Sequence, residues 1–130
     1  MSNNCPFCNI EAKRLWIDNE LAMAVWDSYP CAYGHVLVVP RRHVASIFEL
    51  DERELLALWE LVREARERLE EKYHNDGFNI GINDGVAAGQ TVMHAHVHLI
   101  PRRQGDVEDP RGGVRWVIPE RAVYWKDKEK

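Results

Sequence analysis

The spacing of apolar residues predicts one long helix. Between residues 55 and 73, leucine, tryptophan, valine, alanine and tyrosine recur at intervals of three and four, and charged residues occupy the opposite face. Asp51 and Glu54 suit a capping box at the start of this helix, and Gly77 supplies a stop signal beyond its end. We interpret the charged face as solvated surface.

Shorter apolar runs predict strands on both sides of this helix. Residues 21–27 and 35–40 flank a turn segment with a proline and a glycine, which favours an antiparallel hairpin. Residues 78–83 predict a third strand, and alternation through about 93–100 predicts a fourth. The order strand-strand-helix-strand-strand indicates an α+β domain: an antiparallel meander sheet with the long helix packed on one face.

The end of the chain differs from the rest. Residues 110–130 are rich in tryptophan, valine and isoleucine, and residues 114–118 predict a further short strand that Pro119 limits. We expect a single domain over 1–130, with a core of 1–109 and a tail that covers its own sheet or a partner subunit.

Composition and charge narrow the class of protein. A chain of 130 residues with 45% hydrophobic and 29% charged residues is ordinary for one soluble domain. Apolar runs are too short to span a membrane and the first four residues too polar for a secretory signal, so we expect a cytoplasmic protein without membrane contact. The net charge of −4 argues against binding polymeric nucleic acid, although one nucleotide could still bind at a local site.

The stretch TVMHAHVHLIPR, residues 91–102, carries the main chemical signal. His94, His96 and His98 alternate with apolar residues, and a strand would place all three on one face. Three clustered imidazoles would each need hydrogen-bond partners if buried, which disfavours a purely structural role. Metal binding, nucleophilic catalysis, or both remain as explanations.

The loop in front of the histidines favours phosphate chemistry. Residues 84–91, DGVAAGQT, offer glycines that let a ligand approach the backbone closely, with Gln90 and Thr91 as hydrogen-bond donors. Imidazole is available in its neutral form near pH 7 because its ordinary pKa is about 6.5. A histidine beside such donors could therefore attack a phosphorus atom.

Cys5 and Cys8 form a C-x-x-C pair near the start of the chain. An odd count of three cysteines argues against a disulfide framework, and the lack of a preceding strand disfavours a thioredoxin-like redox motif. Structural zinc needs four ligands, commonly two cysteines and two histidines, and His43 and His94 are the natural completions. The alternative is a turn that binds no metal.

The chain resembles the histidine triad family of nucleotide hydrolases and transferases. HAHVHLI, residues 94–100, matches the family signature of three histidines alternating with hydrophobic residues. Residues 34–44, 76–102 and 105–120 are similar to bacterial members, so the resemblance covers nearly the whole chain. It implies the α+β fold of that family, a sheet continued across a homodimer, and structural zinc held by Cys5, Cys8, His43 and His94.

The resemblance also implies a role for each residue of the site. His96 would attack the α-phosphorus, with its other ring nitrogen anchored on a backbone carbonyl; His98 would donate to the phosphate oxygens, and His35 would lie behind the site. The remaining residues that would contact the substrate are Gln90 and Thr91 as loop donors, Asn83 as a polar contact, Asp27 on the ribose hydroxyls, and Phe7, Ile10 and Val25 around the base. Asp27 could instead be a turn residue, and the three apolar residues could be plain core.

The expected activity is hydrolysis at the α-phosphate of dinucleoside polyphosphates or AMP-X adducts, through a nucleotidyl-histidine intermediate and without a catalytic metal. The segment from the glutamine loop onward resembles the dinucleoside polyphosphate hydrolase (fragile histidine triad) branch, whereas Asn83 and Asp27 fit the phosphoramidase branch. A purine nucleoside phosphoramidase, a nucleotidyltransferase or a phosphorylase therefore remains an alternative. So does a zinc-stabilised nucleotide-binding regulatory module.

Overall fold

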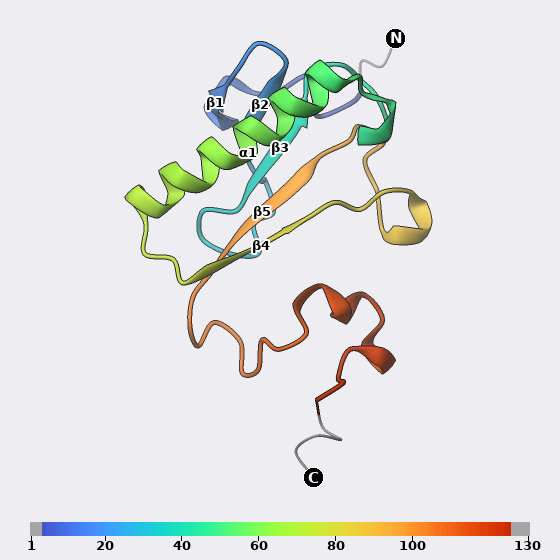
Figure 1. Cartoon of the computed structure of the whole chain (residues 1–130). Coiled ribbons are helices and arrows are strands. Elements are labelled where there is room, and N and C mark those ends of the chain that lie inside the picture. The colour runs from blue at the N-terminus through green and yellow to red at the C-terminus, as the bar shows by residue number, and fades with distance from the viewer. Residues whose placement is uncertain (1–3, 126–130) are drawn as a thin grey trace.

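One long helix lies across one face of an antiparallel sheet in the computed structural model, which describes residues 4–125 (Figure 1). The helix is α1 (Glu52–Lys72), and the strands are β1 (Leu15–Asp18), β2 (Ala22–Trp26), β3 (Val36–Pro40), β4 (Gly77–Gly81) and β5 (Val97–Arg102). Short 3-10 helices cover Ala12–Arg14, Ile47–Glu49, Val86–Ala88, Gly113–Val117 and Pro119–Arg121. The predicted α+β class and the predicted long helix are confirmed. Within the described residues, no helix is both long enough and apolar enough to cross a membrane.

The start of α1 is fixed by the predicted capping box. The Asp51 carboxylate accepts a hydrogen bond from the Glu54 N–H, and the Glu54 carboxylate accepts one from the Asp51 N–H. The prediction that Gly77 ends the helix is wrong, because Gly77 is the first residue of β4. The Asn75 side-chain amide instead donates to the carbonyls of Leu69 and Tyr73, which satisfies backbone groups at the helix end.

The sheet has the strand order β1-β2-β3-β5-β4, with every neighbouring pair antiparallel. After β4 the chain returns so that β5, the histidine strand, lies between β3 and β4 and is hydrogen-bonded on both sides. Regular strand structure begins only at Val97, so His94 and His96 lie in the segment that leads into β5. β1 was not predicted: it is a four-residue edge strand whose register shifts along its length.

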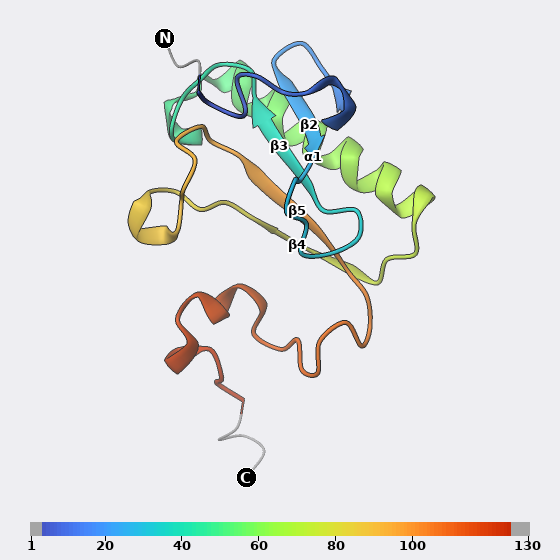
Figure 2. The same ribbon diagram turned by 180° about the vertical axis from the view of Figure 1, so that it is seen from behind.

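Alternation along β2 and β3 divides the buried side chains between the two faces of the sheet. Val36 and Val38 join the core under α1, together with Leu58, Leu61, Leu69 and others. Leu37 and Val39 point the other way, against Cys5 and Phe7. Figure 2 shows the N-terminal segment crossing this second face. A leucine or valine buried in either cluster contributes roughly 1.5–3 kcal/mol to the free energy of unfolding.

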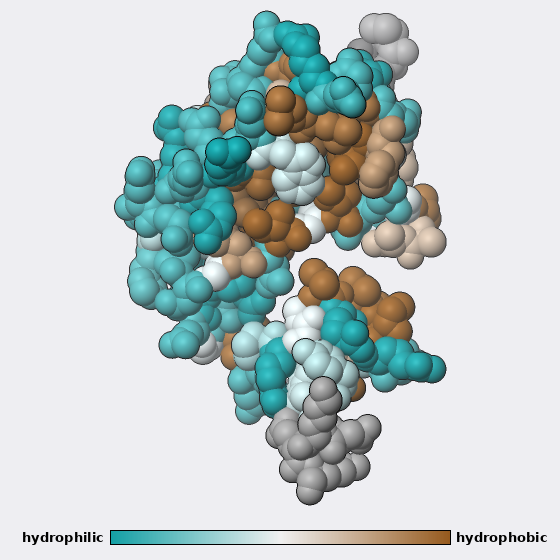
Figure 3. All heavy atoms as spheres, viewed as in Figure 1, coloured by the Kyte–Doolittle hydropathy of each residue, from teal (hydrophilic) through white to brown (hydrophobic). Residues whose placement is uncertain are grey.

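The tail after β5 forms local helical turns. The strand predicted over 114–118 is wrong: Gly113–Val117 is a 3-10 helix, in which Arg115 donates its N–H to the Gly112 carbonyl and Ile118 donates to Arg115. Gly112 and Gly113 have positive φ, which turns the chain and prevents an extended run. Apolar side chains of the tail gather on the side that faces the sheet in Figure 3. Residues 126–130 of the expected tail lie outside the described residues.

Candidate active site and metal centre

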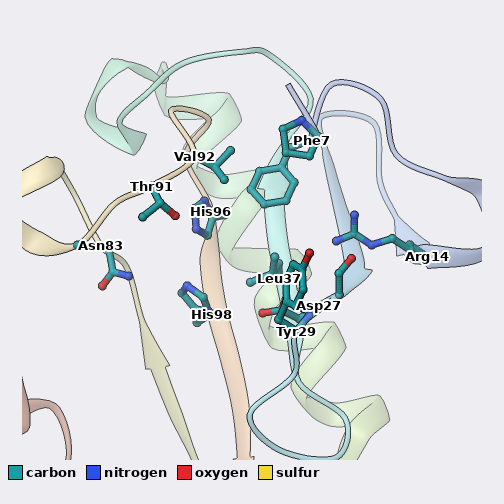
Figure 4. Close-up of a pocket in the computed structure, with 13 residues that line it drawn as sticks. Phe7, Arg14, Asp27, Tyr29, Leu37, Asn83, Thr91, Val92, His96 and His98 are labelled. Atoms are coloured by element: carbon teal, nitrogen blue, oxygen red, sulfur yellow. Dashed lines mark hydrogen bonds between the residues drawn. The ribbon is translucent and has the colours of Figure 1, made fainter. Parts of the chain in front are cut away.

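A pocket opens on the face of the sheet opposite α1 (Figure 4). His98 of β5 pairs in register with Leu37 of β3, so both side chains reach this face. The N-terminal segment closes one side of the pocket, and the glycine loop before β5 closes another. The lining residues are Pro6, Phe7, Arg14, Asp27, Ser28, Tyr29, Leu37, Asn83, Gly89, Thr91, Val92, His96 and His98.

His96 has one ring nitrogen anchored and the other available. Its Nδ1 lies 2.8 Å from the backbone carbonyl oxygen of His94. A carbonyl oxygen only accepts, so Nδ1 carries the proton and Nε2 keeps its lone pair. The ring is nearly buried, and the edge of Phe7 packs against it with ring centroids 5.0 Å apart. The sequence therefore builds an oriented imidazole at the wall of the pocket.

A chain of hydrogen bonds leads to His98. The backbone N–H of Cys31 donates to His35 Nδ1 at 3.1 Å, so the proton of neutral His35 is on Nε2. That Nε2 lies 3.1 Å from His98 Nδ1 and 3.2 Å from an Asp27 carboxylate oxygen. When His35 donates to His98, the proton of His98 is on Nε2. Figure 4 shows His98 beside His96 at the pocket.

Burial keeps the rings of His98 and His35 neutral at pH 7. Burial, with smaller contributions from the neighbouring rings of His96 and His35, lowers the pKa of His98 to about 4 against an opposing effect of Asp27. Burial also lowers the pKa of His35, again opposed by Asp27. A neutral His98 can both accept from His35 and donate into the pocket, which a doubly protonated ring could not do.

Gln90 holds the glycine loop in place. Its side chain is buried; Oε1 accepts from the Gly85 N–H at 2.8 Å, and Nε2 donates to the carbonyls of Ala45 at 2.8 Å and Val92 at 3.0 Å. Its amide donors are therefore used within the chain rather than directed into the pocket. Gly89, with φ of +97°, adopts a conformation that side chains disfavour, and it lines the pocket with its neighbour Thr91.

Four groups meet behind His96 with the spacing of a metal site. Cys5 Sγ, Cys8 Sγ, His43 Nδ1 and His94 Nδ1 all lie within 4.8 Å of one another. His94 Nδ1 is 3.3 Å from Cys5 Sγ, 3.6 Å from Cys8 Sγ and 3.1 Å from His43 Nδ1. Tetrahedral zinc, with bonds of about 2.3 Å to sulfur and 2.0–2.1 Å to nitrogen, separates its ligand atoms by roughly 3.3–3.8 Å. The donor set fits zinc in both chemistry and spacing.

The second ring nitrogen of His94 explains why this ring faces the cysteines. Its Nε2 lies 2.8 Å from the Pro40 carbonyl oxygen and therefore carries the proton. Nδ1 then presents its lone pair to the two sulfur atoms and His43. Such outer hydrogen bonds commonly orient histidine ligands of metals.

Comparison of the sequence with known protein families identifies the family of this chain. Residues 10–105 match the family profile described as the HIT domain. The chain belongs to the HIT family.

Curated relatives of this HIT protein include enzymes that cleave dinucleoside polyphosphates. A bis(5′-adenosyl)-triphosphatase of Dictyostelium discoideum is 37% identical over 100 residues, covering 77% of this chain and 67% of the relative. An asymmetrical bis(5′-nucleosyl)-tetraphosphatase of Schizosaccharomyces pombe is 42% identical over 90 residues, covering 69% of this chain and half (50%) of the relative. These names support a nucleotide hydrolase.

The solved structures include a close match in length. The crystal structure of a Zn-bound histidine triad family protein from Mycobacterium smegmatis has a TM-score of 0.72 and 30% identity, and the match covers 100% of both chains. This neighbour supports the fold. That relative of this HIT protein is a zinc-bound protein.

The structure brings some of the predicted substrate-contacting residues to the pocket and places others beneath it. Phe7, Asp27, Asn83 and Thr91 line the pocket. Three predicted residues do not line it: the Gln90 amide bonds within the loop, Val25 is fully buried, and Ile10 packs against the cluster that contains Phe7 and Leu37. The Asp27 carboxylate also accepts from the Tyr29 N–H at 2.9 Å, so Asp27 is both a turn residue and a pocket residue.

Several pocket residues were missed by sequence reasoning. Leu37 could have been found, because it alternates with the valines of β3 and must share a face with the histidines once the two strands pair. Arg14 carries no motif, and only the folded N-terminal segment brings it to the pocket. Tyr29, at 90% exposure, stands at the rim, where a turn residue would ordinarily be solvent-facing surface.

Proposed function

We propose that this HIT protein hydrolyses nucleotides at the α-phosphate, first transferring the nucleotidyl group to His96 and then to water. The observation that carries this proposal is the hydrogen bond from His96 Nδ1 to the His94 carbonyl, because it leaves the Nε2 lone pair for attack. A bond forms between Nε2 and the α-phosphorus while the bond to the leaving-group oxygen breaks. Water then displaces the imidazole, forms the nucleoside monophosphate and restores neutral His96.

His98 and the glycine loop supply hydrogen-bond donors around the phosphate. Negative charge on the oxygens of the α-phosphate must be stabilised as phosphorus becomes five-coordinate, and fixed donors do this without reorganisation. His98 Nε2–H and the Thr91 hydroxyl are available at the pocket, and Gln90 keeps the loop in position from below. His35 acts as a positioning residue because it sets which nitrogen of His98 holds the proton.

The substrate class we propose is dinucleoside polyphosphates or AMP-X adducts. The names of the slime-mould and yeast relatives support it. With the α-phosphorus at His96, the Asp27 carboxylate would accept from the ribose hydroxyls and the Phe7 ring would contact the base.

Zinc would have a structural role in this protein. The ligands Cys5 and Cys8 come from the N-terminal segment, whereas His43 follows β3 and His94 precedes β5, so a metal joins three parts of the chain. Zinc would supply binding energy that stabilises this junction. The His94 residue that binds it also carries the carbonyl that anchors His96. The metal centre therefore supports the backbone on which the nucleophile is oriented.

The decisive experiment ranks kcat/KM for diadenosine tri- and tetraphosphate against an AMP–lysine amide. We expect turnover of the polyphosphates, its loss in His96→Ala, and retention in His74→Ala. His74 is a suitable control because it is exposed and its ring lies beside Asp76 at a distance from the pocket. A ranking led by the amide would favour the phosphoramidase alternative. No turnover of any of these compounds would favour the regulatory module.

A further inference from the structure

Arg14 is a cation without an ion-pair partner in the part of the chain that the structure describes. Its Nε donates to the Trp26 carbonyl at 3.1 Å, and its side chain is half-buried and lines the pocket. Six other arginines pair with carboxylates: Arg41, Arg42, Arg53, Arg68, Arg102 and Arg111. Arg103 and Arg115 also bond only to uncharged groups, but among the arginines that the structure describes Arg14 alone lines this pocket. The Nη groups of Arg14 are therefore donors held at a site that takes a ligand.

The place of Arg14 determines which part of a nucleotide it meets. Figure 4 shows Arg14 at the end of the pocket away from His96 and His98, while Thr91 and Asn83 lie on the histidine side. Its hydrogen bond to Trp26 fixes the guanidinium beside the end of β2, next to Asp27. With phosphorus at His96 and ribose at Asp27, the next group along the nucleotide is the base.

The chemistry of a guanidinium distinguishes the two purines. Arginine has N–H donors and no acceptor. Guanine presents two acceptors on one edge, O6 and N7, whereas adenine presents N7 beside an amino group that is itself a donor. The apolar neighbours Phe7 and Leu37 contact either base equally well, so they do not distinguish the two.

We propose that Arg14 makes the nucleoside end of this pocket prefer guanine over adenine, by donating to O6 and N7. This inference rests on the proposed function only for the direction in which the nucleotide lies. The matching substrates are guanosine-containing dinucleoside polyphosphates or GMP adducts. A bidentate arginine–guanine contact discriminates between bases by roughly 5- to 150-fold, and we expect about tenfold at this half-buried site.

Calorimetric binding of the nucleoside monophosphates tests the proposal without any turnover. The intact protein should bind GMP about tenfold more tightly than AMP. IMP should behave like GMP, because it keeps O6 and N7 and lacks only the 2-amino group. A protein that binds nucleotide in this direction without turnover would still prefer GMP, whereas normal turnover without a GMP preference would overturn only the guanine assignment.

Variants then assign the preference to the side chain. Arg14→Met, which keeps the aliphatic stem, should weaken GMP about tenfold and AMP less than twofold. Lys13→Met is the matched control, since it removes the same charge from an exposed neighbour that does not line the pocket. If Arg14→Met does not fold, Arg14→Lys replaces it in the experiment. We expect Arg14→Lys to weaken GMP binding by less than tenfold but more than it weakens AMP binding.

Three results would overturn the assignment. IMP that binds like AMP would exclude a contact to O6. Equal weakening of GMP and AMP in Arg14→Met would indicate a general attraction to phosphate. Tight binding of adenosine 3′,5′-bisphosphate with no preference between AMP and GMP would assign Arg14 to an anion on the ribose.

Discussion

His94 and His96 lie two residues apart, yet their rings face different parts of the molecule. His94 donates from Nε2 to the Pro40 carbonyl and turns Nδ1 toward Cys5 and Cys8. His96 donates from Nδ1 to the His94 carbonyl and turns Nε2 toward the pocket. Each ring uses one nitrogen for the backbone, and the choice of nitrogen decides what the other can do.

The comparison teaches that residue type alone does not define a histidine site. Both rings are buried and both are held by carbonyl oxygens. One faces thiols and a third imidazole, a set that favours zinc, and the other faces a pocket with hydrogen-bond donors. In our proposal, these neighbouring groups are what give His94 a structural role and His96 a catalytic role along one short segment.

Among the variants, we expect replacement of His96 to have the largest effect on turnover. His96→Ala should lower kcat by roughly 10⁴-fold or more, because no other group supplies the attacking nitrogen. Binding of nucleoside monophosphate should stay within a few-fold, since the pocket walls and the loop donors remain. Turnover and calorimetry on the same preparation check this. A variant that keeps wild-type turnover would remove the distinction between the two rings.

His98 should matter less than His96. His98→Ala removes one donor to the phosphate and should lower kcat by roughly 10²–10³-fold, with a small change in KM. His35→Ala should cost less, roughly tenfold, because it only positions the proton of His98. Steady-state kinetics on the series gives the order His96, His98, His35. A larger loss at His35 than at His98 would contradict these roles.

Replacing the proposed metal ligands should lower the stability of the folded protein. Elemental analysis should find about one zinc per chain, and Cys5→Ser should lower both metal content and Tm. A loss of about 2 kcal/mol would lower Tm by roughly 6–10 °C for a domain of this size. Cys31→Ser is the control, since Cys31 is not among the four clustered ligands and its backbone N–H remains to hold His35. Full zinc in the Cys5/Cys8 double variant would exclude this ligand set.

The smallest effect concerns the proposed homodimer. β4 forms an edge of the sheet, and the tail beside it exposes Val114, Val117 and Ile118 at 64%, 76% and 54%. An exposed apolar surface beside an open edge favours contact with a second copy. Val117→Asp should weaken association at least tenfold by light scattering, whereas Leu56→Asp on the exposed face of α1 should not. An intact protein that is monomeric at micromolar concentration would exclude the dimer.

Sequence patterns predicted those features of the fold that depend on residues close together in the chain. The Asp51–Glu54 capping box and the apolar stripe of α1 needed no knowledge of the rest of the chain. The H-x-H-x-H spacing and the resemblance of the surrounding segments singled out His96, His98, Thr91 and Asp27, which the structure places around one pocket. The Cys5–Cys8 pair could be completed by two histidines because the chemistry of zinc limits the choice.

Features that depend on distant contacts escaped prediction. β1 is four residues long and exists because β2 pairs with it. Residues 114–118 have the composition of a strand, but two preceding glycines with positive φ turn them into a helix. The side chain of Gln90 faces inward because Ala45 and Val92 offer carbonyls there, and nothing near Arg14 in the sequence indicates a pocket.

The central claim, that His96 attacks phosphorus, is tested most directly by the stereochemistry of hydrolysis at the α-phosphorus. A substrate made chiral there with sulfur and hydrolysed in ¹⁸O-labelled water gives a product whose configuration can be determined. Two successive displacements, by His96 and then by water, each invert the centre, so the account predicts net retention. Net inversion would mean that water attacks in a single step, and would contradict a nucleotidyl-His96 intermediate.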